Sequence, residues 1–313
     1  MKKEKINNVE KIIFDLDVGV DDAMALIMSF YDPSYDVKLI TTVYGNVGIK
    51  QATKNTCYLV QEYGDKDYPI YMGNEQPLDN PIYNAQEVHG RNGLGTKVVA
   101  KNVKKKVSNK PGYGAIEAMR DTILAYPNEI TIVSVGPTTN VAKLLTTYPE
   151  VKDKIKRIVI MVGSMDGKGS ITPYSSFNSY CDPDAVKVVI TSGVPITLTT
   201  KEIGTTAYFE QKQRERFAKC GSCGPLFYDL CEGYRDMILK HDQYAVHDTC
   251  ALFSILDTDL FTREKVDMEV NTTRDIKRGQ TKFKPNPNSH ITLITTVDKK
   301  KLFKRMEKIL KNS

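Results

Sequence analysis

The chain has no tryptophan, only six cysteines among 313 residues, and no apolar run as long as a membrane-spanning helix. A span of that kind needs roughly 18 predominantly apolar residues, so we expect no membrane partner. Residues 1–8 are charged and lack the apolar segment of a secretory signal, which makes a cytoplasmic location the default. No proline- or glycine-rich linker divides the sequence, and we therefore predict one domain over residues 1–313.

The cysteines are too few and too irregularly spaced to indicate a disulfide framework. Cys220 and Cys223 form one C-x-x-C pair, which Cys231 and His241 could complete as a zinc site. Because there is no second C-x-x-C pair, the interpretation that we favour is a surface loop with reduced thiols.

The formal net charge is +6, and much of it comes from residues 101–110 and 299–305. Neither segment carries the interleaved aromatic residues of a single-strand nucleic-acid binder. We therefore expect a solvated basic surface and no nucleic-acid partner. The positive balance would still favour small anionic ligands by electrostatic steering.

Apolar runs alternate with helical patterns along the chain. The runs predict strands over residues 12–14, 37–43, 130–135, 158–162 and 196–200. The helical patterns between them cover residues 49–63, 114–125, 139–148 and 183–191. This alternation predicts an α/β fold with a mainly parallel sheet and helices on both faces. Ligands of such folds bind beyond the carboxyl ends of the strands.

Four aspartates crowd the end of the first predicted strand, within the eight positions 15–22: Asp15, Asp17, Asp21 and Asp22. Carboxylates placed so closely repel one another unless a cation lies among them. Hard divalent ions such as Ca²⁺ and Mg²⁺ prefer oxygen ligands of this kind. The alternative is an acidic first helical turn, which the helix dipole favours.

Other polar residues follow the ends of later strands or begin helices. Asn46 and the pair Gly163-Ser164 come directly after predicted strands. His247 and Asp248 begin an apolar helical pattern, where they could act only as helix caps. His89 lies in a glycine-bounded segment that indicates a loop.

In their order along the chain, these segments resemble the inosine–uridine-type nucleoside hydrolases. The resemblance covers nearly the whole chain, and its most specific part is the D-x-D-x-G-x-D-D segment that begins at Asp15. The further matching segments are Tyr44-Gly-Asn-Val-Gly48, His89-Gly90, Gly136-Pro-Thr-Thr-Asn140, Ile160-Met-Val-Gly163, Phe177-Asn178, Cys181-Asp-Pro-Asp-Ala185, Ser192-Gly-Val-Pro-Ile196, Val246-His-Asp248 and Arg278-Gly-Gln-Thr281.

The resemblance implies a single Rossmann-like α/β domain around a mixed, mostly parallel sheet. It implies an enzyme of purine or pyrimidine salvage that hydrolyses the N-glycosidic bond of ribonucleosides with bound Ca²⁺. It also implies a homodimer or homotetramer. The ligands of the ion would be the carboxylates of Asp17, Asp22 and Asp248 and the backbone carbonyl of Val135. Asp17 would also be the base that activates the ion-bound water, and Asp15 would support these residues.

The resemblance assigns the remaining site residues to the substrate. Asp21 and Asn46 would contact the ribose diol, and Asn178 the 3′-hydroxyl. His247 would assist the leaving base, and His89 would lie near the base. The substrate-binding set also includes Met161, Ser170, Ser176 and Phe177. Because the chain has no tryptophan to stack on a purine, His247 is the best candidate for leaving-group assistance.

The sequence departs from the family pattern at the ribose 5′ end. Ser170 and Ser176 stand where an asparagine and a glutamate usually hold the 5′-hydroxyl. We therefore hypothesise a sugar that is deoxygenated, bulky or phosphorylated at this position. The alternative is that Tyr174, Ser175 or a water supplies the missing contact.

Two other functions remain open from the sequence. Phe14-Asp-Leu-Asp17 also resembles the opening motif of haloacid-dehalogenase-type phosphatases, which use Mg²⁺, and Lys201 could serve as their lysine. Their late acidic pair is missing here. A non-catalytic nucleoside-binding homologue is the other alternative, and the two serines are the features that favour it.

Overall fold

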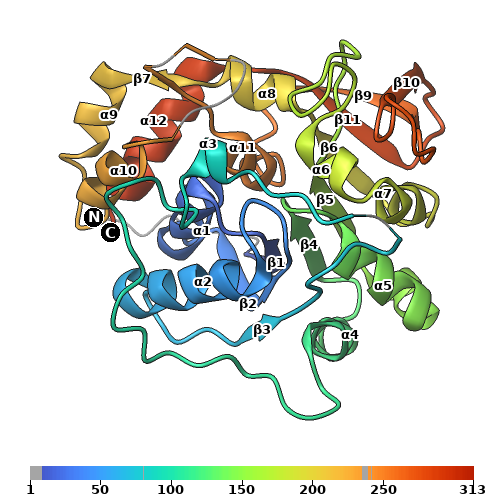
Figure 1. Ribbon diagram of the computed structural model, residues 1–313, viewed down its shortest axis with the longest axis horizontal. Helices are drawn as coiled ribbons and strands as arrows, with labels where there is room; N and C mark the ends of the chain where they lie inside the picture. Colours follow the sequence, from blue (N-terminus) through green and yellow to red (C-terminus); the bar gives the residue numbers. More distant parts are fainter. Residues whose placement is uncertain (1–8, 80, 235–238, 241) are drawn as a thin grey trace.

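The computed structural model describes residues 9–79, 81–234, 239–240 and 242–313. A nine-stranded sheet runs through these residues in the order β10-β9-β11-β6-β5-β4-β1-β2-β3 (Figure 1). Every neighbouring pair from β11 to β3 is parallel, and β9 is antiparallel to both β11 and β10. The predicted mixed, mostly parallel α/β sheet is therefore confirmed.

The strands of the large sheet are β1 (Glu10–Leu16), β2 (Tyr35–Thr42), β3 (Ile70–Met72), β4 (Ile130–Ser134), β5 (Arg157–Met161), β6 (Ile196–Thr199), β9 (Phe261–Val270), β10 (Thr281–Pro285) and β11 (Ile291–Val297). A separate antiparallel pair consists of β7 (Phe209–Glu210) and β8 (Gln243–Tyr244). The central strands β4 and β6 are buried along their whole length. This burial on both faces is why they appear in the sequence as continuous apolar runs.

The helices are α1 (Val20–Tyr31), α2 (Ile49–Tyr63), α3 (Gln86–His89), α4 (Ala115–Ala125), α5 (Thr139–Thr147), the 3₁₀ helix η1 (Pro149–Lys154), α6 (Phe177–Cys181), α7 (Pro183–Ile190), α8 (Lys201–Thr206), α9 (Gln211–Phe217), α10 (Gly224–Leu230), α11 (His247–Phe253) and α12 (Lys299–Leu310). Helices α1, α2, α11 and α12 cover one face of the sheet, and α4, α5 and α7 cover the other (Figure 1). Two large apolar clusters fill the two interfaces between helices and sheet.

The packing of α1 explains its composition. Both α11 and α12 contact it, and its residues from Val20 to Phe30 are buried. Helix α12 is instead amphipathic, since Leu302, Phe303, Met306, Ile309 and Leu310 are its buried residues. Its Arg305 pairs with buried Asp32 at 2.6 Å, which anchors this helix beside the end of α1.

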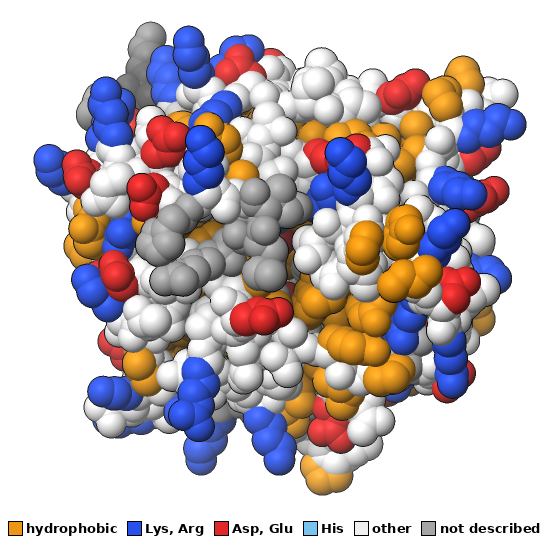
Figure 2. All heavy atoms as spheres, turned by 45° about the horizontal axis from the view of Figure 1, so that its top comes forward, with side chains coloured by type: hydrophobic (Ala, Val, Ile, Leu, Met, Phe, Trp, Pro, Cys, Tyr) orange, Lys and Arg blue, Asp and Glu red, His pale blue; other side chains and the backbone are white. Residues whose placement is uncertain are grey.

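No helix among the described residues is long and apolar enough to cross a bilayer. On the face shown in Figure 2, Lys and Arg side chains are mixed with Asp and Glu side chains, and hydrophobic side chains gather on the right.

One local interpretation of the sequence is confirmed in part, and another is wrong. Cys220 and Cys223 lie in the loop between α9 and α10 and are free thiols, as expected, but both are buried while Gly221 and Ser222 between them are exposed. His241, proposed as their partner in a zinc site, lies outside the described residues. His89 ends the short helix α3 and is 6% exposed, whereas the sequence indicated a loop.

Candidate active site

A cavity of about 150 Å³ opens beyond the carboxyl ends of the central strands. Chain segments that follow β1, β2, β4, β5 and β6 contribute to its wall, as expected for an open parallel sheet. The lining residues are Asp21, Asn46, Asn84, Ala85, Glu87, Val88, His89, Val135, Met161, Ser170, Ile171, Ser176, Phe177, Asn178, Lys201, Tyr234, His247 and Asp248.

Asp15 lies inside the sheet and does not line this cavity. Its Oδ1 accepts hydrogen bonds from Thr41 and Asn140, each at 2.7 Å, and its Oδ2 accepts one from Ser134 at 3.1 Å. Burial nevertheless raises the pKa of Asp15 to about 6, because these hydrogen bonds only partly replace lost hydration. Asp15 thus links β1 to β2, to β4 and to α5 beneath the cavity.

Asn46, a residue of the cavity wall, joins Asp17 to Asp22. Its backbone N–H donates to Asp17 Oδ2 at 2.7 Å, and its side-chain Nδ2 donates to Asp22 Oδ2 at 2.8 Å. Both carboxylates therefore lie directly beneath the wall. Gly45 permits this approach, since a Cβ there would lie 2.0 Å from Asp17 Oδ2.

The first turns of α1 and α11 bring three carboxylates together. Asp21, Asp22 and Asp248 offer oxygens that all lie within 4.8 Å of one another. Burial, followed by the negative charges of Asp21, Asp22 and Asp17, raises the pKa of Asp248 well above its usual range. Burial and the charge of Asp22 raise the pKa of Asp17 in the same way. A divalent cation bound among these carboxylates would relieve this repulsion.

Asp17 provides a second observation of the same kind. Its Oδ1 is buried and accepts no hydrogen bond from the described residues. An unpartnered carboxylate oxygen costs free energy in a low-dielectric interior, and a cation or its water would satisfy it. Asp17 is not part of the group of three carboxylates described above, although it contacts Asp22 through its own backbone N–H at 3.2 Å. The residues present fit a hard divalent ion.

Asn178 connects the cavity to β4 and β5. Its Nδ2 donates to the carbonyl of Val135 at 2.5 Å and to that of Met161 at 3.0 Å. Asn178 lies in the first turn of α6 and is 7% exposed. The structure thus brings the carbonyl of Val135, which the sequence assigned to the ion, next to a side chain that it assigned to the sugar.

The two histidines named from the sequence both line the cavity. His89 Nδ1 accepts a hydrogen bond from the backbone N–H of Val20 at 3.1 Å and lies 3.8 Å from Asp21 Oδ1. This acceptor role at Nδ1 leaves the ring proton on Nε2. His247 begins α11 and lies against Gly204 of α8, where a Cβ would come within 2.0 Å of its Nδ1.

Ser170, Ser176 and Phe177 also line the cavity. Ser176 Oγ accepts from the backbone N–H of Gly163 at 2.8 Å and shares a hydrogen bond with Ser179 Oγ at 2.9 Å. The Ser175 hydroxyl donates to the carbonyl of Arg278. Neither Ser175 nor Tyr174 lines the cavity, so the structure gives no support to a replacement contact from these two residues.

Sequence reasoning missed several lining residues, among them Lys201, Tyr234, Asn84 and Glu87. Lys201 carried a usable signal, because it directly follows Thr200 at the carboxyl end of a predicted central strand. Tyr234 had none, since its ring comes 5.4 Å from that of His89 only through tertiary packing.

Comparisons with known proteins agree with this arrangement. Residues 12–304 match the family model described as inosine-uridine preferring nucleoside hydrolase. The chain is 35% identical over 268 residues to uridine nucleosidase 1 of Arabidopsis thaliana, a match that covers 84% of this chain and 79% of the relative. It is 33% identical over 270 residues to the non-specific ribonucleoside hydrolase RihC of Salmonella enteritidis, with 86% of each chain covered. Among solved structures, a plant nucleoside hydrolase superposes with a TM-score of 0.86 at 26% identity, covering 97% of this chain and 99% of that one.

Proposed function

Since the chain belongs to the inosine-uridine preferring nucleoside hydrolase family, we propose that the cavity beyond the sheet is where it hydrolyses the N-glycosidic bond of ribonucleosides. The observation that carries this placement is the group of buried carboxylates under the cavity, with Asp17 Oδ1 accepting no hydrogen bond from the described residues. A non-catalytic homologue and a phosphatase are not favoured, because the relatives are named as nucleoside hydrolases.

The family is metal-dependent, and the ion that we propose here is Ca²⁺. Its ligands would be the carboxylates of Asp17, Asp22 and Asp248 and the carbonyl of Val135. The support is an all-oxygen donor set in which burial raises the pKa of each of these three carboxyl groups, and the negative charges of neighbouring carboxylates raise those of Asp17 and Asp248 further. When bound, a cation of this kind lowers the pKa of a water and orients it. Ca²⁺ acidifies water less than Zn²⁺ does, which leaves a role for a protein base.

Asp17 is the proposed base. It takes a proton from the attacking water as the water oxygen bonds to the anomeric carbon and the bond to the base nitrogen breaks. Positive charge builds on the ribosyl ring in an oxocarbenium-like state. The carboxylates of Asp21 and Asp248 stabilise this charge. His247 supplies the proton that the leaving base needs.

The remaining residues would position the substrate. Asp21 and Asn46 would contact the ribose diol, and Asn178 the 3′-hydroxyl. His89 would lie beside the base, while Asp15 would support the carboxylates from within the sheet. Met161 and Phe177 would flank the sugar near its 5′ end, together with the two serines. Each of these residues except Asp15 lines the cavity, which supports the assignment.

We further propose that the whole chain is one domain, that it acts in the cytoplasm in nucleoside salvage, and that it forms a homodimer or homotetramer. Leu78, Ile82 and Ile276 are exposed hydrophobic residues. The ion pair between Arg274 and Asp79 joins the two loops that carry them. An apolar surface built from these loops supports self-association. Sedimentation velocity would measure the oligomeric state.

The test of the proposed function is release of free base from a panel of nucleosides, before and after treatment with a chelator. We expect hydrolysis of uridine or inosine that chelation abolishes and Ca²⁺ restores. Tight nucleoside binding without base release over hours would instead indicate a non-catalytic homologue. Phosphatase turnover with Mg²⁺ and no base release would indicate the other alternative.

A further inference from the structure

We propose that the end of the cavity formed by Ser170, Ser176 and Lys201 binds a negatively charged 5′ substituent, such as a phosphate, and that Lys201 determines this specificity. The inference rests on the proposed function, because the orientation of the sugar defines which end of the cavity meets the 5′ position. The substrate class is then nucleosides that carry an anionic 5′ group.

Lys201 is an unusual residue for a cavity wall. It is the first residue of α8, directly beyond the carboxyl end of β6, and it is only 6% exposed. Its backbone N–H donates to the carbonyl of Gly163 at 3.2 Å, and the N–H of Gly163 donates to Ser176 Oγ at 2.8 Å, so Lys201 and Ser176 are neighbours in the wall. Buried lysines are rare unless they are paired, so the partners of the Lys201 ammonium group decide what it can still bind.

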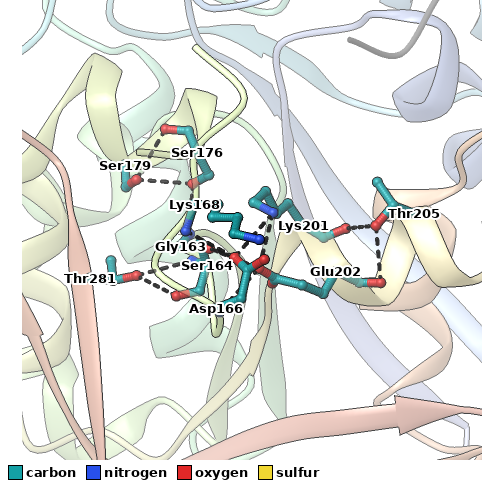
Figure 3. A network of polar contacts seen from close by, with 10 residues as sticks. All are labelled: Gly163, Ser164, Asp166, Lys168, Ser176, Ser179, Lys201, Glu202, Thr205 and Thr281. Atoms are coloured by element: carbon teal, nitrogen blue, oxygen red, sulfur yellow. Dashed lines mark hydrogen bonds and ion pairs between the residues drawn. The ribbon is translucent and has the colours of Figure 1, made fainter. Parts of the chain in front are cut away.

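The ammonium group is held from outside the cavity. Lys201 Nζ lies 3.1 Å from Glu202 Oε1 and 3.5 Å from Asp166 Oδ1, and neither carboxylate lines the cavity. Ser164 Oγ lies 2.8 Å from both carboxylates and joins them (Figure 3). An ammonium has three N–H donors, and two ion pairs leave capacity for a third contact. The network thus fixes a cation at the wall before any substrate binds.

The Ser176 hydroxyl is engaged within the wall. Its Oγ accepts from Gly163 N–H and is hydrogen-bonded to Ser179 Oγ, as Figure 3 shows. A 5′-hydroxyl would therefore meet the ammonium group of Lys201 here but no carboxylate that could take its own proton. A phosphate or carboxylate only accepts hydrogen bonds, so it suits a wall built from an ammonium and hydroxyl groups. The absence of a glutamate at position 176 also removes a charge that would repel such a group.

The first experiment compares kcat/KM for uracil release from uridine, uridine 5′-monophosphate and 5′-deoxyuridine, with the Ca²⁺-loaded enzyme. We expect the monophosphate to exceed uridine by about 10-fold or more, because a charge-assisted contact replaces an unmet hydroxyl. The 5′-deoxy compound separates charge from mere loss of the hydroxyl, and we expect it to remain below the monophosphate.

The second experiment repeats the comparison with variants. Lys201→Met should lower the ratio of monophosphate to uridine by about 10- to 100-fold, while Lys201→Arg should retain most of it. Ser176→Glu should lower the ratio as well, through repulsion. Lys168→Met is the matched control, because Lys168 is exposed on the loop that carries Asp166 and Ser170 and does not line the cavity. It should leave both rates unchanged. Thermal unfolding checks that each variant folds.

The outcomes test the anionic 5′ substituent and the proposed function separately. Uracil release from uridine with no preference for the monophosphate would overturn the anionic 5′ substituent and leave the proposed function intact. Equal loss on both substrates in Lys201→Met would also overturn it, because the residue would then act on folding or on the whole site. Failure to release base from any of the three compounds and from inosine would contradict the proposed function itself.

Discussion

At the scale of single residues, Asp17 is held through one oxygen only. Oδ2 accepts the N–H of Asn46 at 2.7 Å, whereas Oδ1 is buried and accepts no hydrogen bond from the described residues. Asp15, two positions earlier, instead has both oxygens hydrogen-bonded to side chains of the sheet and α5. The two aspartates therefore suit different roles. Asp15 stabilises the structure, whereas Asp17 can bind a ligand or accept a proton.

Replacing Asp17 with asparagine should lower kcat for uridine by about 100- to 10,000-fold, the usual contribution of a positioned general base. The amide keeps the shape of the side chain but can neither accept the proton of the water nor carry charge to the cation. Asp36→Asn is the control, because Asp36 lies in β2 and pairs at the surface with Lys38 and Lys66. Initial-rate measurements at saturating Ca²⁺ test this, and a loss below 10-fold would remove Asp17 from the chemistry.

His247 allows a sharper test, because its proposed role depends on the leaving group. His247→Ala should lower kcat/KM for uridine by about 100-fold. With a riboside of p-nitrophenol, whose leaving group needs no proton, the loss should be much smaller. His290→Ala is the control, since its ring contacts the carbonyl of Ile190 at the end of α7 and its own carbonyl accepts from Ile196 N–H at the amino end of β6, away from the cavity. An equal loss on both substrates would show that His247 positions the sugar and does not assist departure of the base.

At the scale of elements, the contact between α8 and α11 sets the position of His247. Gly204 of α8 lies so close that a Cβ there would be 2.0 Å from His247 Nδ1 and 2.7 Å from its Cα. Gly204→Ala should therefore push α11 away and lower kcat for uridine by about 10-fold or more, with a loss of about 1–3 kcal/mol in stability. Gly48→Ala is the control, because nothing lies within 4 Å of a Cβ at Gly48. Steady-state kinetics and urea unfolding measure the two effects, and wild-type kinetics in Gly204→Ala would contradict this role of the contact.

The helices and strands differ in how well the sequence predicts them. The helix over residues 49–63 was predicted with the bounds that α2 has, and the central strands were all found, because a buried parallel strand and an amphipathic helix each leave a periodic pattern. Strands β3, β9, β10 and β11 of the large sheet were missed. In β9 the buried and exposed positions alternate irregularly, and Phe261, Val266 and Met268 are buried between charged residues. Strand β9 is specified by its pairing with β10 and β11 and not by its own composition.

The residues of the candidate site also differ in how well the sequence predicts them. Residues in short motifs, such as Asp17 and Asp22, could be named in advance because their spacing places them together in space. Tyr234 could not be assigned to the wall, since its nearness to His89 arises only from tertiary packing. Lys201 was missed although its place directly after a predicted central strand was a usable signal. The commitment of the Ser176 hydroxyl to Gly163 was equally invisible, because hydrogen-bond partners 13 positions apart have no sequence signature.

At the scale of the whole molecule, the fold concentrates negative charge where it is least hydrated. The carboxyl ends of the strands and the first turns of α1 and α11 bring Asp15, Asp17, Asp22 and Asp248 into one buried region. The pKa of each carboxyl group is raised, chiefly by burial. Without a cation, this region destabilises the folded state at neutral pH, and the two large apolar clusters must offset that cost.

This arrangement predicts how stability depends on pH and Ca²⁺. The pKa of Asp15 is about 6 in the folded state against 3.8 for the ordinary group, so the folded state binds more protons between these values. The free energy of unfolding of the chelated protein should therefore fall as pH rises from about 5 to about 7, and the raised pKa values of Asp17, Asp22 and Asp248 act in the same direction. Ca²⁺ at about 100 times its Kd should add about 2.7 kcal/mol to the free energy of unfolding at pH 7 and less at pH 5, where protons compete for the carboxylates.

Urea unfolding at pH 5 and at pH 7, each with chelator and with Ca²⁺, measures the four conditions. The control variant Asp36→Asn should retain the full response to Ca²⁺. A stability gain from Ca²⁺ that is as large at pH 5 as at pH 7 would contradict binding at these carboxylates.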